Sequence, residues 1–342
     1  MLRQIRLSAA VIAMVALPTL AAADQLADQW KICDGTGPAD QRIEACTWII
    51  KSGNETKKNI AIAYGNRGAA YRAKDDLDSA IRDYDEVIKL DPKSASSYMF
   101  RGNGYRARGD YDRAIADYNT AIRLDRNDAG PLVGRGNIYS AKNEYERAIS
   151  DYNAALKIRP KYPLAFRNRG IVYSKMKNFD HAIDDYSEAI RLDPTYAEAY
   201  DNRGDAWYDK KDYDRAIADY SEAVRLYPSN PTYLNDRCWT RAVAGRDLPQ
   251  ALSDCDQALR IRPNYESALK SRGLVFLKLD RPNDALVDYS SALKQNPKNA
   301  FSLYGAGLAR LRKGDNDGNA DLDAAKAIDA EVADEYARYG LK

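Results

Sequence analysis

Histidine is nearly absent from the 342-residue sequence, which limits the acid–base chemistry open to the chain. The single histidine, His181, stands between Asp180 and Ala182 at the expected start of a helix, where we predict that it faces solvent. The sequence has no nucleophile elbow, no phosphate-binding loop and no HExxH metal motif. Carboxylates are numerous, but they recur at regular intervals instead of gathering in one segment. We therefore predict a protein with no enzymatic activity, no cofactor and no metal.

The segment DNDGNADLD, residues 315–323, is the part of the chain most similar to a metal site. Its alternating acids are typical of a calcium loop, but the closing Glu of such a loop is missing. The segment also falls where a repeat, described next, turns between two helices. We expect a capped turn here, with calcium binding as the alternative.

The chain repeats itself every 34 residues. NRGAAYRAKDDLDSAIRDYDEVIKLDP, from Asn66, aligns with FRGNGYRARGDYDRAIADYNTAIRLD, from Phe100, and eight such repeats fill about residues 60 to 330. One position is small in every repeat: Gly68, Gly102, Gly136, Gly170, Gly204, Cys238, Gly273 and Gly307. A second position is always alanine: Ala80, Ala114, Ala148, Ala182, Ala216, Ala251, Ala285 and Ala320. Small side chains at fixed places in two successive helices let the two backbones approach closely.

Each repeat has the spacing of a helical hairpin. Gly102 and Tyr105 fall on one face of a first helix, and Ala114 and Tyr118 fall on one face of a second. Asp110 is placed to cap the second helix. A proline, which cannot continue a helix, ends the second helix of six repeats. These residues are Pro92, Pro160, Pro194, Pro228, Pro263 and Pro297.

The order of small, Tyr, Ala, Tyr, Ala and Pro positions at a 34-residue period resembles the tetratricopeptide repeat (TPR). The resemblance covers most of the chain and implies an all-α, right-handed α-solenoid of about eight hairpins. It also implies a concave groove lined by the first helices, and a function in binding peptides or partner proteins. Val332, where the other repeats have Pro, begins a C-terminal segment that we interpret as a capping helix.

The N-terminus differs from the repeats. Arg3 and Arg6 precede an apolar run, residues 7–20, and residues 21–23 are three alanines. This pattern predicts a secretory signal and a periplasmic protein, with an N-terminal membrane anchor as the alternative. We expect a signal peptide at 1–23, a degenerate helical cap at 24–59, repeats at 60–330 and a capping helix at 331–342. Without the signal the chain has no net charge, so we expect no nucleic-acid partner and no membrane insertion after cleavage.

Two charged positions also recur. The residue before the small position, apolar in the usual repeat, is Arg67, Arg101, Arg135, Arg169, Arg203, Arg237 and Arg272. The second helices carry Asp83, Asp117, Asp151, Asp185, Asp219, Asp254, Asp288 and Asp323. We predict that each Arg pairs with the Asp of its own repeat, because that arrangement leaves only one Asp without a partner. Pairing with the preceding repeat and an anion-binding stripe of Arg are the alternatives.

Tyrosine also follows the repeat, for example at Tyr84, Tyr118, Tyr152, Tyr186, Tyr220 and Tyr289. We interpret this column as core, with sugar stacking as the alternative.

The expected groove offers a candidate partner-binding surface, whose residues follow from the resemblance. In the fifth repeat Glu198, Asp201, Asp205 and Asp209 share one helix face and form an acidic patch suited to a partner with basic residues. A plain solvated face is the alternative. The remaining groove candidates are Met99, Asn103, Asn137, Arg167, Asn168, Ile171, Asn202, Tyr208, Asn235, Asp236 and Trp239. Asn side chains suit a peptide backbone because they both donate and accept hydrogen bonds.

Two classes of function remain. The first is a non-catalytic scaffold that binds protein or peptide partners. The second is a carbohydrate or cell-wall polymer binder, in which groove residues such as Tyr208 and Trp239 would contact sugars.

The four cysteines replace repeat positions in pairs. Cys238 takes the small position and Cys255 the Tyr position of one repeat, and these positions face each other across the hairpin. Cys46 takes the Tyr position in the N-terminal cap, and Cys33 takes the small position if the turn there is shortened. The predicted oxidising compartment favours two disulfides, Cys33–Cys46 and Cys238–Cys255. Free buried thiols are the alternative.

Overall fold

The structure, a computed structural model, describes residues 20–341, and all regular structure in this range is helical. It contains nineteen α-helices and no strand, which confirms the predicted all-α class. The helices fall into two compact units that divide between residues 141 and 142, and each unit is described by itself. The predicted signal peptide lies almost entirely outside the described residues, so secretion stays a prediction.

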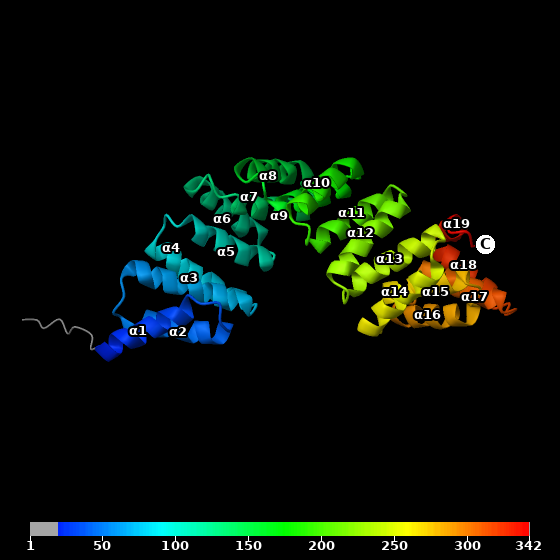
Figure 1. The fold of residues 1–342 in the computed structure, drawn as a ribbon, viewed down its shortest axis with the longest axis horizontal. Coiled ribbons are helices and arrows are strands. Elements are labelled where there is room, and N and C mark those ends of the chain that lie inside the picture. Colours follow the sequence, from blue (N-terminus) through cyan, green and yellow to red (C-terminus); the bar gives the residue numbers. More distant parts are fainter. Residues whose placement is uncertain (1–19, 342) are drawn as a thin grey trace, which may run out of the picture. The chain divides into compact units, whose positions relative to one another are not determined.

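The N-terminal unit holds the first seven helices. These are α1 (Leu20–Cys33), α2 (Ala39–Ser52), α3 (Lys57–Ala73), α4 (Leu77–Leu90), α5 (Ala95–Ala107), α6 (Tyr111–Leu124) and α7 (Gly130–Ala141). Each helix packs against the next, so that hairpin follows hairpin along the unit (Figure 1).

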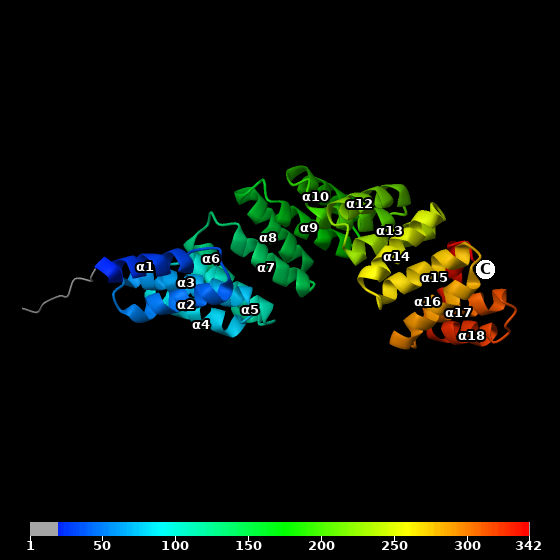
Figure 2. The same cartoon turned by 60° about the horizontal axis from the view of Figure 1, so that its bottom comes forward.

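The C-terminal unit holds the other twelve helices. These are α8 (Tyr145–Ile158), α9 (Pro163–Lys175), α10 (Phe179–Leu192), α11 (Ala197–Asp209), α12 (Tyr213–Leu226), α13 (Pro231–Ala244), α14 (Leu248–Ile261), α15 (Glu266–Lys278), α16 (Pro282–Gln295), α17 (Ala300–Arg312), α18 (Gly318–Ile328) and α19 (Val332–Arg338). Successive hairpins pack in series here as well, and α13 also contacts α15, the first helix of the next hairpin (Figure 2).

Close packing between the small position and the Tyr position holds five of the hairpins together. A Cβ atom placed on Gly170 would lie 2.7 Å from the ring of Tyr186, and one on Gly204 would lie 2.7 Å from the ring of Tyr220. The Tyr rings of this column are 0–2% exposed, which confirms that they are core. A larger side chain at the small position would therefore push the two helices of the hairpin apart.

The turn and the helix ends also follow the sequence signals. Asp110 caps α6 by accepting a hydrogen bond from the backbone N–H of Arg113, as predicted. Gly109, which precedes the cap, has a φ of 77°, in the left-handed region that favours glycine. The second helices end two residues before their prolines, for example at Leu192 before Pro194.

The Arg and Asp columns pair within six of the repeats, as predicted. Arg169 donates from two nitrogens to Asp185 at 2.8 and 2.5 Å, and this hydrogen bonding raises the pKa of Arg169 while burial opposes the rise. The same two-nitrogen pairing joins Arg67 to Asp83, Arg101 to Asp117, Arg203 to Asp219, Arg237 to Asp254 and Arg272 to Asp288.

The Arg column also links neighbouring repeats, which the sequence analysis did not anticipate. The third nitrogen of the guanidinium reaches the second helix of the preceding hairpin. Arg101 donates to Asp85 at 2.6 Å, Arg169 to Asn153 at 2.5 Å and Arg203 to Ser187 at 2.9 Å. One Arg side chain thus joins three helices. It pairs with the Asp of its own repeat and at the same time contacts the second helix of the preceding repeat.

Both predicted cysteine pairs are joined in the structure. Cys238 in α13 and Cys255 in α14 are disulfide bonded with their Cα atoms 5.7 Å apart. Cys33 and Cys46 join α1 to α2 with a Cα–Cα distance of 5.0 Å. In the α13–α14 hairpin the covalent bond takes the place of the Gly-to-Tyr contact found in the other hairpins.

Helix α19 closes the last hairpins. Its Tyr336 is fully buried, stacks on Phe301 with ring centroids 4.5 Å apart and donates a hydrogen bond to the backbone carbonyl of Phe301. This helix covers apolar surface that the eighth repeat, with Ala324 in the Tyr position, leaves open.

Candidate functional site

The predicted acidic patch lies on α11. Glu198, Asp205 and Asp209 are exposed, whereas Asp201 is half-buried. Helix α13 adds Asp236, which was predicted as a groove residue but not as a member of this patch. The structure therefore brings together three mutually interacting carboxyl groups, those of Asp201, Asp205 and Asp236, and we call them the carboxyl cluster.

The carboxyl cluster holds protons near neutral pH. Desolvation raises the pKa of Asp201 to about 8, and the like charges of Asp205 and Asp236 contribute to the rise, while Arg167 opposes it. Desolvation likewise raises the pKa of Asp236 to about 7 and that of Asp205 to about 6. The three groups titrate as a coupled set.

The three members of the carboxyl cluster differ in their hydrogen bonding. Asp205 accepts a hydrogen bond from the hydroxyl of Tyr220 at 2.7 Å, and Asp236 accepts one from Asn235 at 3.1 Å. The Oδ1 atom of Asp201 is buried and has no hydrogen-bond partner among the described residues. The surroundings of Asp201 therefore favour the neutral form of its carboxyl group.

This protonation predicts a pH-dependent stability. A carboxyl group whose pKa is raised in the folded state keeps a proton that the unfolded chain has released, so folding weakens as the pH rises toward the folded pKa. The carboxyl groups have a pKa near 3.8 when unfolded and, in the folded state, of about 8 for Asp201 and about 7 for Asp236, so the loss begins near pH 4 and is still under way from roughly pH 6 to pH 8. Allowing for partial solvation, we expect wild-type protein to lose about 2 kcal/mol of unfolding free energy over that range.

Urea unfolding at a series of pH values measures this dependence. The double variant Asp201→Asn/Asp236→Asn should flatten it, and Asp184→Asn, an exposed position on α10, should keep the wild-type slope. Equal slopes for wild type and the double variant would contradict the assignment.

Helix α9 supplies the next candidates. Arg167 donates to the side-chain oxygen of Asn202 at 2.9 Å and lies over the ring of Tyr196, so two predicted residues hold each other. Ile171 is half-buried and packs against an apolar cluster that includes Ile183. Asn168 is half-buried on the same helix.

Asn235 is not a surface residue. It is 6% exposed, accepts a hydrogen bond from Ser271 at 2.8 Å and donates to Asp236. The prediction that Asn235 lines the groove is wrong, because its side-chain amide forms hydrogen bonds inside the protein that hold α13 against α15.

Tyr208 and Trp239 are engaged within the molecule. The indole N–H of Trp239 donates to the Tyr208 hydroxyl at 2.8 Å, and the Trp239 ring meets the edges of Phe301 and Tyr339 at 5.5 and 5.6 Å. Tyr339 follows α19, so the C-terminal segment covers part of this aromatic pair. A sugar-stacking platform needs open ring faces, and the carbohydrate alternative loses its main support here.

The three candidates in the N-terminal unit are half-buried on first helices. Met99 and Asn103 lie on α5, and Asn137 lies on α7. Asn103 accepts a hydrogen bond from the hydroxyl of Tyr118 at 2.7 Å, so its oxygen serves the core.

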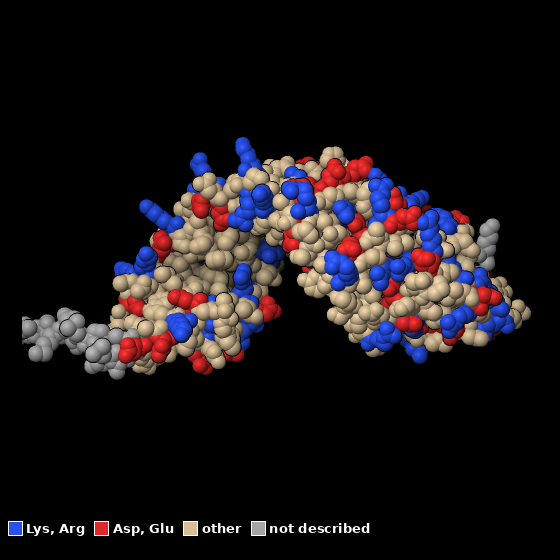
Figure 3. All heavy atoms as spheres, in the orientation of Figure 1, with Lys and Arg blue, Asp and Glu red and all other residues tan. Residues whose placement is uncertain are grey.

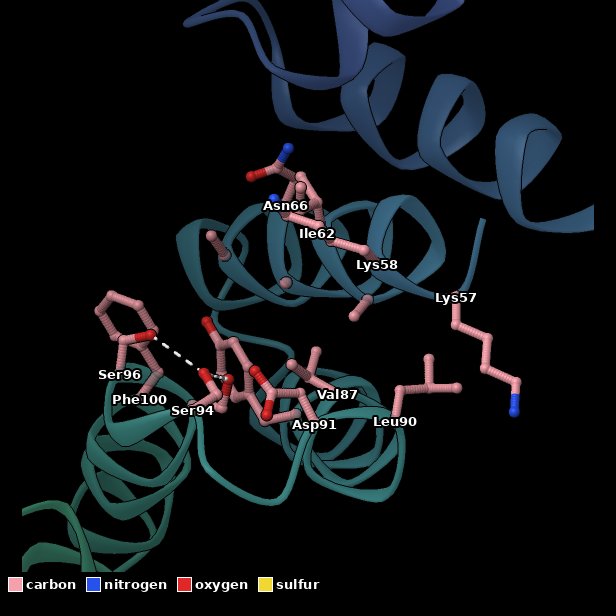
Figure 4. A pocket seen from close by; sticks show the side chains of 15 residues that line it. Lys57, Lys58, Ile62, Asn66, Val87, Leu90, Asp91, Ser94, Ser96 and Phe100 are labelled. Carbon is pink, nitrogen blue, oxygen red and sulfur yellow. Dashed lines mark hydrogen bonds between the residues drawn. The ribbon is translucent and has the colours of Figure 1, made fainter. Parts of the chain in front are cut away.

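A pocket of about 730 Å³, which was not predicted from the sequence, lies between α3, α4 and α5 (Figure 4). Its apolar lining includes Ile62, Val87, Leu90 and Phe100, and we call it the α3–α5 pocket. Lys57, Lys58, Asn66, Asp91, Ser94 and Ser96 supply polar groups at its rim. An alignment of the first repeat with the second indicates why this pocket forms.

The α3–α5 pocket exists because α3 carries small residues on its first-helix face. Gly65 and Ala69 stand where the next repeat has Met99 and Asn103. Both small residues line the pocket. The space that larger side chains fill in the second repeat is therefore left open in the first.

The surface of the described residues carries charges of both signs (Figure 3). Basic and acidic side chains are interspersed over the face shown in Figure 3. Within residues 20–341 no group of three or more His, Cys, Asp or Glu side chains is arranged to hold a metal ion. No helix in this described range combines the length and apolar character needed to cross a bilayer.

Sequence profiles identify the repeats. A TPR repeat profile matches residues 102–142 and 136–177, and Tetratricopeptide repeat profiles match residues 61–94, 167–231 and 270–334. Together these matches cover well over half of the chain. A comparison with curated proteins found no matching sequence.

Solved structures show the same fold at low identity. The APC/C hetero-tetramer Cut9–Hcn1 aligns with a TM-score of 0.57 at 15% identity, covering 89% of this chain and 60% of that one. The Pseudomonas aeruginosa pilF protein aligns at 0.55 and 20% identity, covering 63% and 97%. The C-terminal part of a TPR repeat-containing protein from Cytophaga hutchinsonii aligns at 0.55 and 19%, covering 70% and 97%. From the hairpin geometry, the repeat columns and the matching profiles, the chain belongs to the tetratricopeptide-repeat family.

Proposed function

We propose that this protein is a non-catalytic scaffold that binds protein or peptide partners on the face formed by its first helices. The supporting observation is how variation is distributed within the repeats. The Arg, Asp, Ala and Tyr columns recur because they hold the hairpins together. The first-helix position directly after the small residue changes in character from Ala69 through Asn103, Asn137, Ile171 and Asp205 to Trp239, and in the last two repeats it is a buried leucine, Leu274 and Leu308.

The constant positions hold the hairpins together, and the variable position is the candidate for contact with a partner. A position that only supported the hairpin would face the same neighbours in every repeat and would keep one residue type. Within each unit, positions that differ from one first helix to the next suit an extended partner, which meets a different surface at each step. The TPR family's general association with protein binding agrees with this proposal.

The exposed acids of α11 suit basic side chains on such a partner. Glu198 and Asp209 are both exposed, and no ion pair involving either is present among the described residues. The carboxyl cluster beside them gains negative charge as the pH rises, so attraction for a basic segment should grow between about pH 6 and pH 8.

The predicted signal sequence and the two disulfides support a periplasmic location. Disulfides persist in oxidising compartments and are rare where thiols are kept reduced. Cys33, Cys46, Cys238 and Cys255 are all fully buried and all paired in the described range. We propose that the scaffold acts after export.

Chemical crosslinking in the native compartment tests the function. Wild-type protein should yield a defined set of protein partners, and Glu198→Lys/Asp209→Lys should lose those that use α11. Glu146→Lys/Asp184→Lys, at exposed positions on second helices, is the matched control and should keep the full set. Recovery of polysaccharide without protein would contradict the proposal.

A further inference from the structure

The hydroxyl groups of the Tyr column are satisfied in most repeats but not in the first. Tyr118 donates to Asn103 and Tyr220 donates to Asp205, both at 2.7 Å. Tyr186 shares a hydrogen bond with Ser174, and the Tyr289 and Tyr336 hydroxyls are hydrogen bonded to each other at 3.1 Å. The Tyr84 hydroxyl is buried and has no partner among the described residues. A buried donor without a partner carries a free-energy cost, so this exception calls for a physical cause.

The first repeat lacks the side-chain oxygen that accepts the hydrogen bonds of Tyr118 and Tyr220. Asn103 and Asp205 occupy the first-helix position from which a side-chain oxygen reaches the Tyr hydroxyl. In the first repeat that position is Ala69, which has no polar atom to offer. The same change opens the α3–α5 pocket, and Tyr84 is part of its lining.

Tyr84 is held firmly at the floor of the pocket. Its side chain is 1% exposed, its ring lies against Gly68, and it stacks on Phe100 with ring centroids 5.8 Å apart. Phe100, which stacks on Tyr84, is only half-buried and lines the pocket with it. A ligand oxygen arriving there would supply the missing acceptor.

The charges around the pocket are mainly positive. Lys57 and Lys58 are exposed on its rim, and Asp91 is the only acid in its lining. Burial raises the pKa of Tyr84, and the nearby charges of Arg72 and Arg42 oppose that rise. The half-buried Arg42 also has a buried Nε atom with no hydrogen-bond partner in the described part of the chain.

We propose that the α3–α5 pocket binds an extended partner segment in which a large apolar residue stands next to Asp or Glu. The apolar side chain packs against Ile62, Val87 and Phe100, and the carboxylate accepts a hydrogen bond from the Tyr84 hydroxyl. A volume of about 730 Å³ is within the usual range for ligand pockets. The inference rests on the proposed scaffold function and names the chemistry of one partner.

A carboxylate fits this pocket better than a neutral or basic group. A neutral amide would satisfy Tyr84 but would gain nothing from the surrounding cations. A lysine or arginine would meet like charges on Lys57, Lys58 and Arg42 and would leave the hydroxyl without an acceptor. The pocket thus differs from α11, where the exposed groups suit a basic segment.

A peptide array supplies the probe. It presents 12-residue peptides in which Leu or Phe stands beside Glu, Gln or Lys, and purified full-length protein is applied to it. We expect the strongest binding to peptides with Glu beside Leu or Phe. The strongest binder is then titrated by fluorescence anisotropy.

Two variants with one control separate recognition from folding. Tyr84→Phe removes only the hydroxyl and should weaken binding about tenfold without lowering the melting temperature, because no hydrogen bond within the protein is lost. Tyr118→Phe breaks the bond to Asn103, so it should lower the melting temperature by about 2 °C and leave binding unchanged. Lys57→Glu/Lys58→Glu should weaken binding of the Glu-containing peptide and leave binding of the matching Gln-containing peptide unchanged.

A preference for Lys-containing or Gln-containing peptides, an array without binding, or equal affinity of Tyr84→Phe and wild type would overturn the inference. If crosslinking still recovers protein partners in that case, the pocket assignment fails alone. If crosslinking recovers none, the scaffold function fails with it.

Discussion

Replacing Asp185 by alanine is expected to lower the unfolding free energy by about 3 kcal/mol. Asp185 is 5% exposed and receives two hydrogen bonds from Arg169. Without the carboxylate, a largely buried guanidinium keeps its charge and loses its counter-ion. We expect a value at the lower end of the range for broken buried pairs, because Arg169 retains its bond to Asn153 and some contact with water.

The same helix offers a matched control. Glu188 of α10 also pairs with an arginine, Arg191, but both side chains lie at the surface. Glu188→Ala is expected to change the unfolding free energy by less than about 1 kcal/mol, since exposed pairs contribute little. Urea unfolding followed by circular dichroism measures both variants. Similar small losses in the two would contradict the role assigned to the Arg and Asp columns.

Removing the Cys238–Cys255 disulfide is expected to cost about 3 kcal/mol. The bond closes a loop with a sequence separation of 17 residues, and it replaces the Gly-to-Tyr contact that holds the other hairpins. Cys238→Ala/Cys255→Ala therefore loses the covalent link and gains no Gly-to-Tyr contact in its place, so α13 should separate from α14 at lower urea concentration.

Reducing agent provides the control for this prediction. Dithiothreitol should destabilise wild-type protein, whereas a variant lacking all four cysteines should show no response. A measured mass showing four free thiols in protein from its native compartment, or a cysteine-free variant as stable as wild type, would contradict it.

The hairpins were predictable from sequence because their packing is local and repeated. Gly170 and Tyr186 are only 16 residues apart, and the same contact recurs in other repeats, so alignment alone shows that a small residue must face a large one. The charged columns were predictable for the same reason. The contact from Arg169 to Asn153 in the preceding hairpin was not predicted, because the pattern within one repeat does not show how that hairpin packs on the next.

The candidate site was less predictable, since its properties depend on contacts that are distant in the chain. Trp239 is partly covered by Tyr339, a residue 100 positions later, and Asn235 is buried by Ser271 of α15. The neutral form of Asp201 results from burial and from Asp236 on another helix. The α3–α5 pocket, in contrast, could have been found by comparing Ala69 with Asn103.

Site-specific photo-crosslinking in the native compartment tests the central claim most directly. A benzophenone amino acid is placed at position 62 on α3, at position 198 on α11, or at position 287 on α16. Ile62, Glu198 and Val287 are all exposed, but only the first two lie on first helices. We predict defined protein crosslinks from positions 62 and 198 and none above background from position 287. Equal crosslinking from all three positions, or none from the first helices, would contradict a scaffold that binds its partners on the first-helix face.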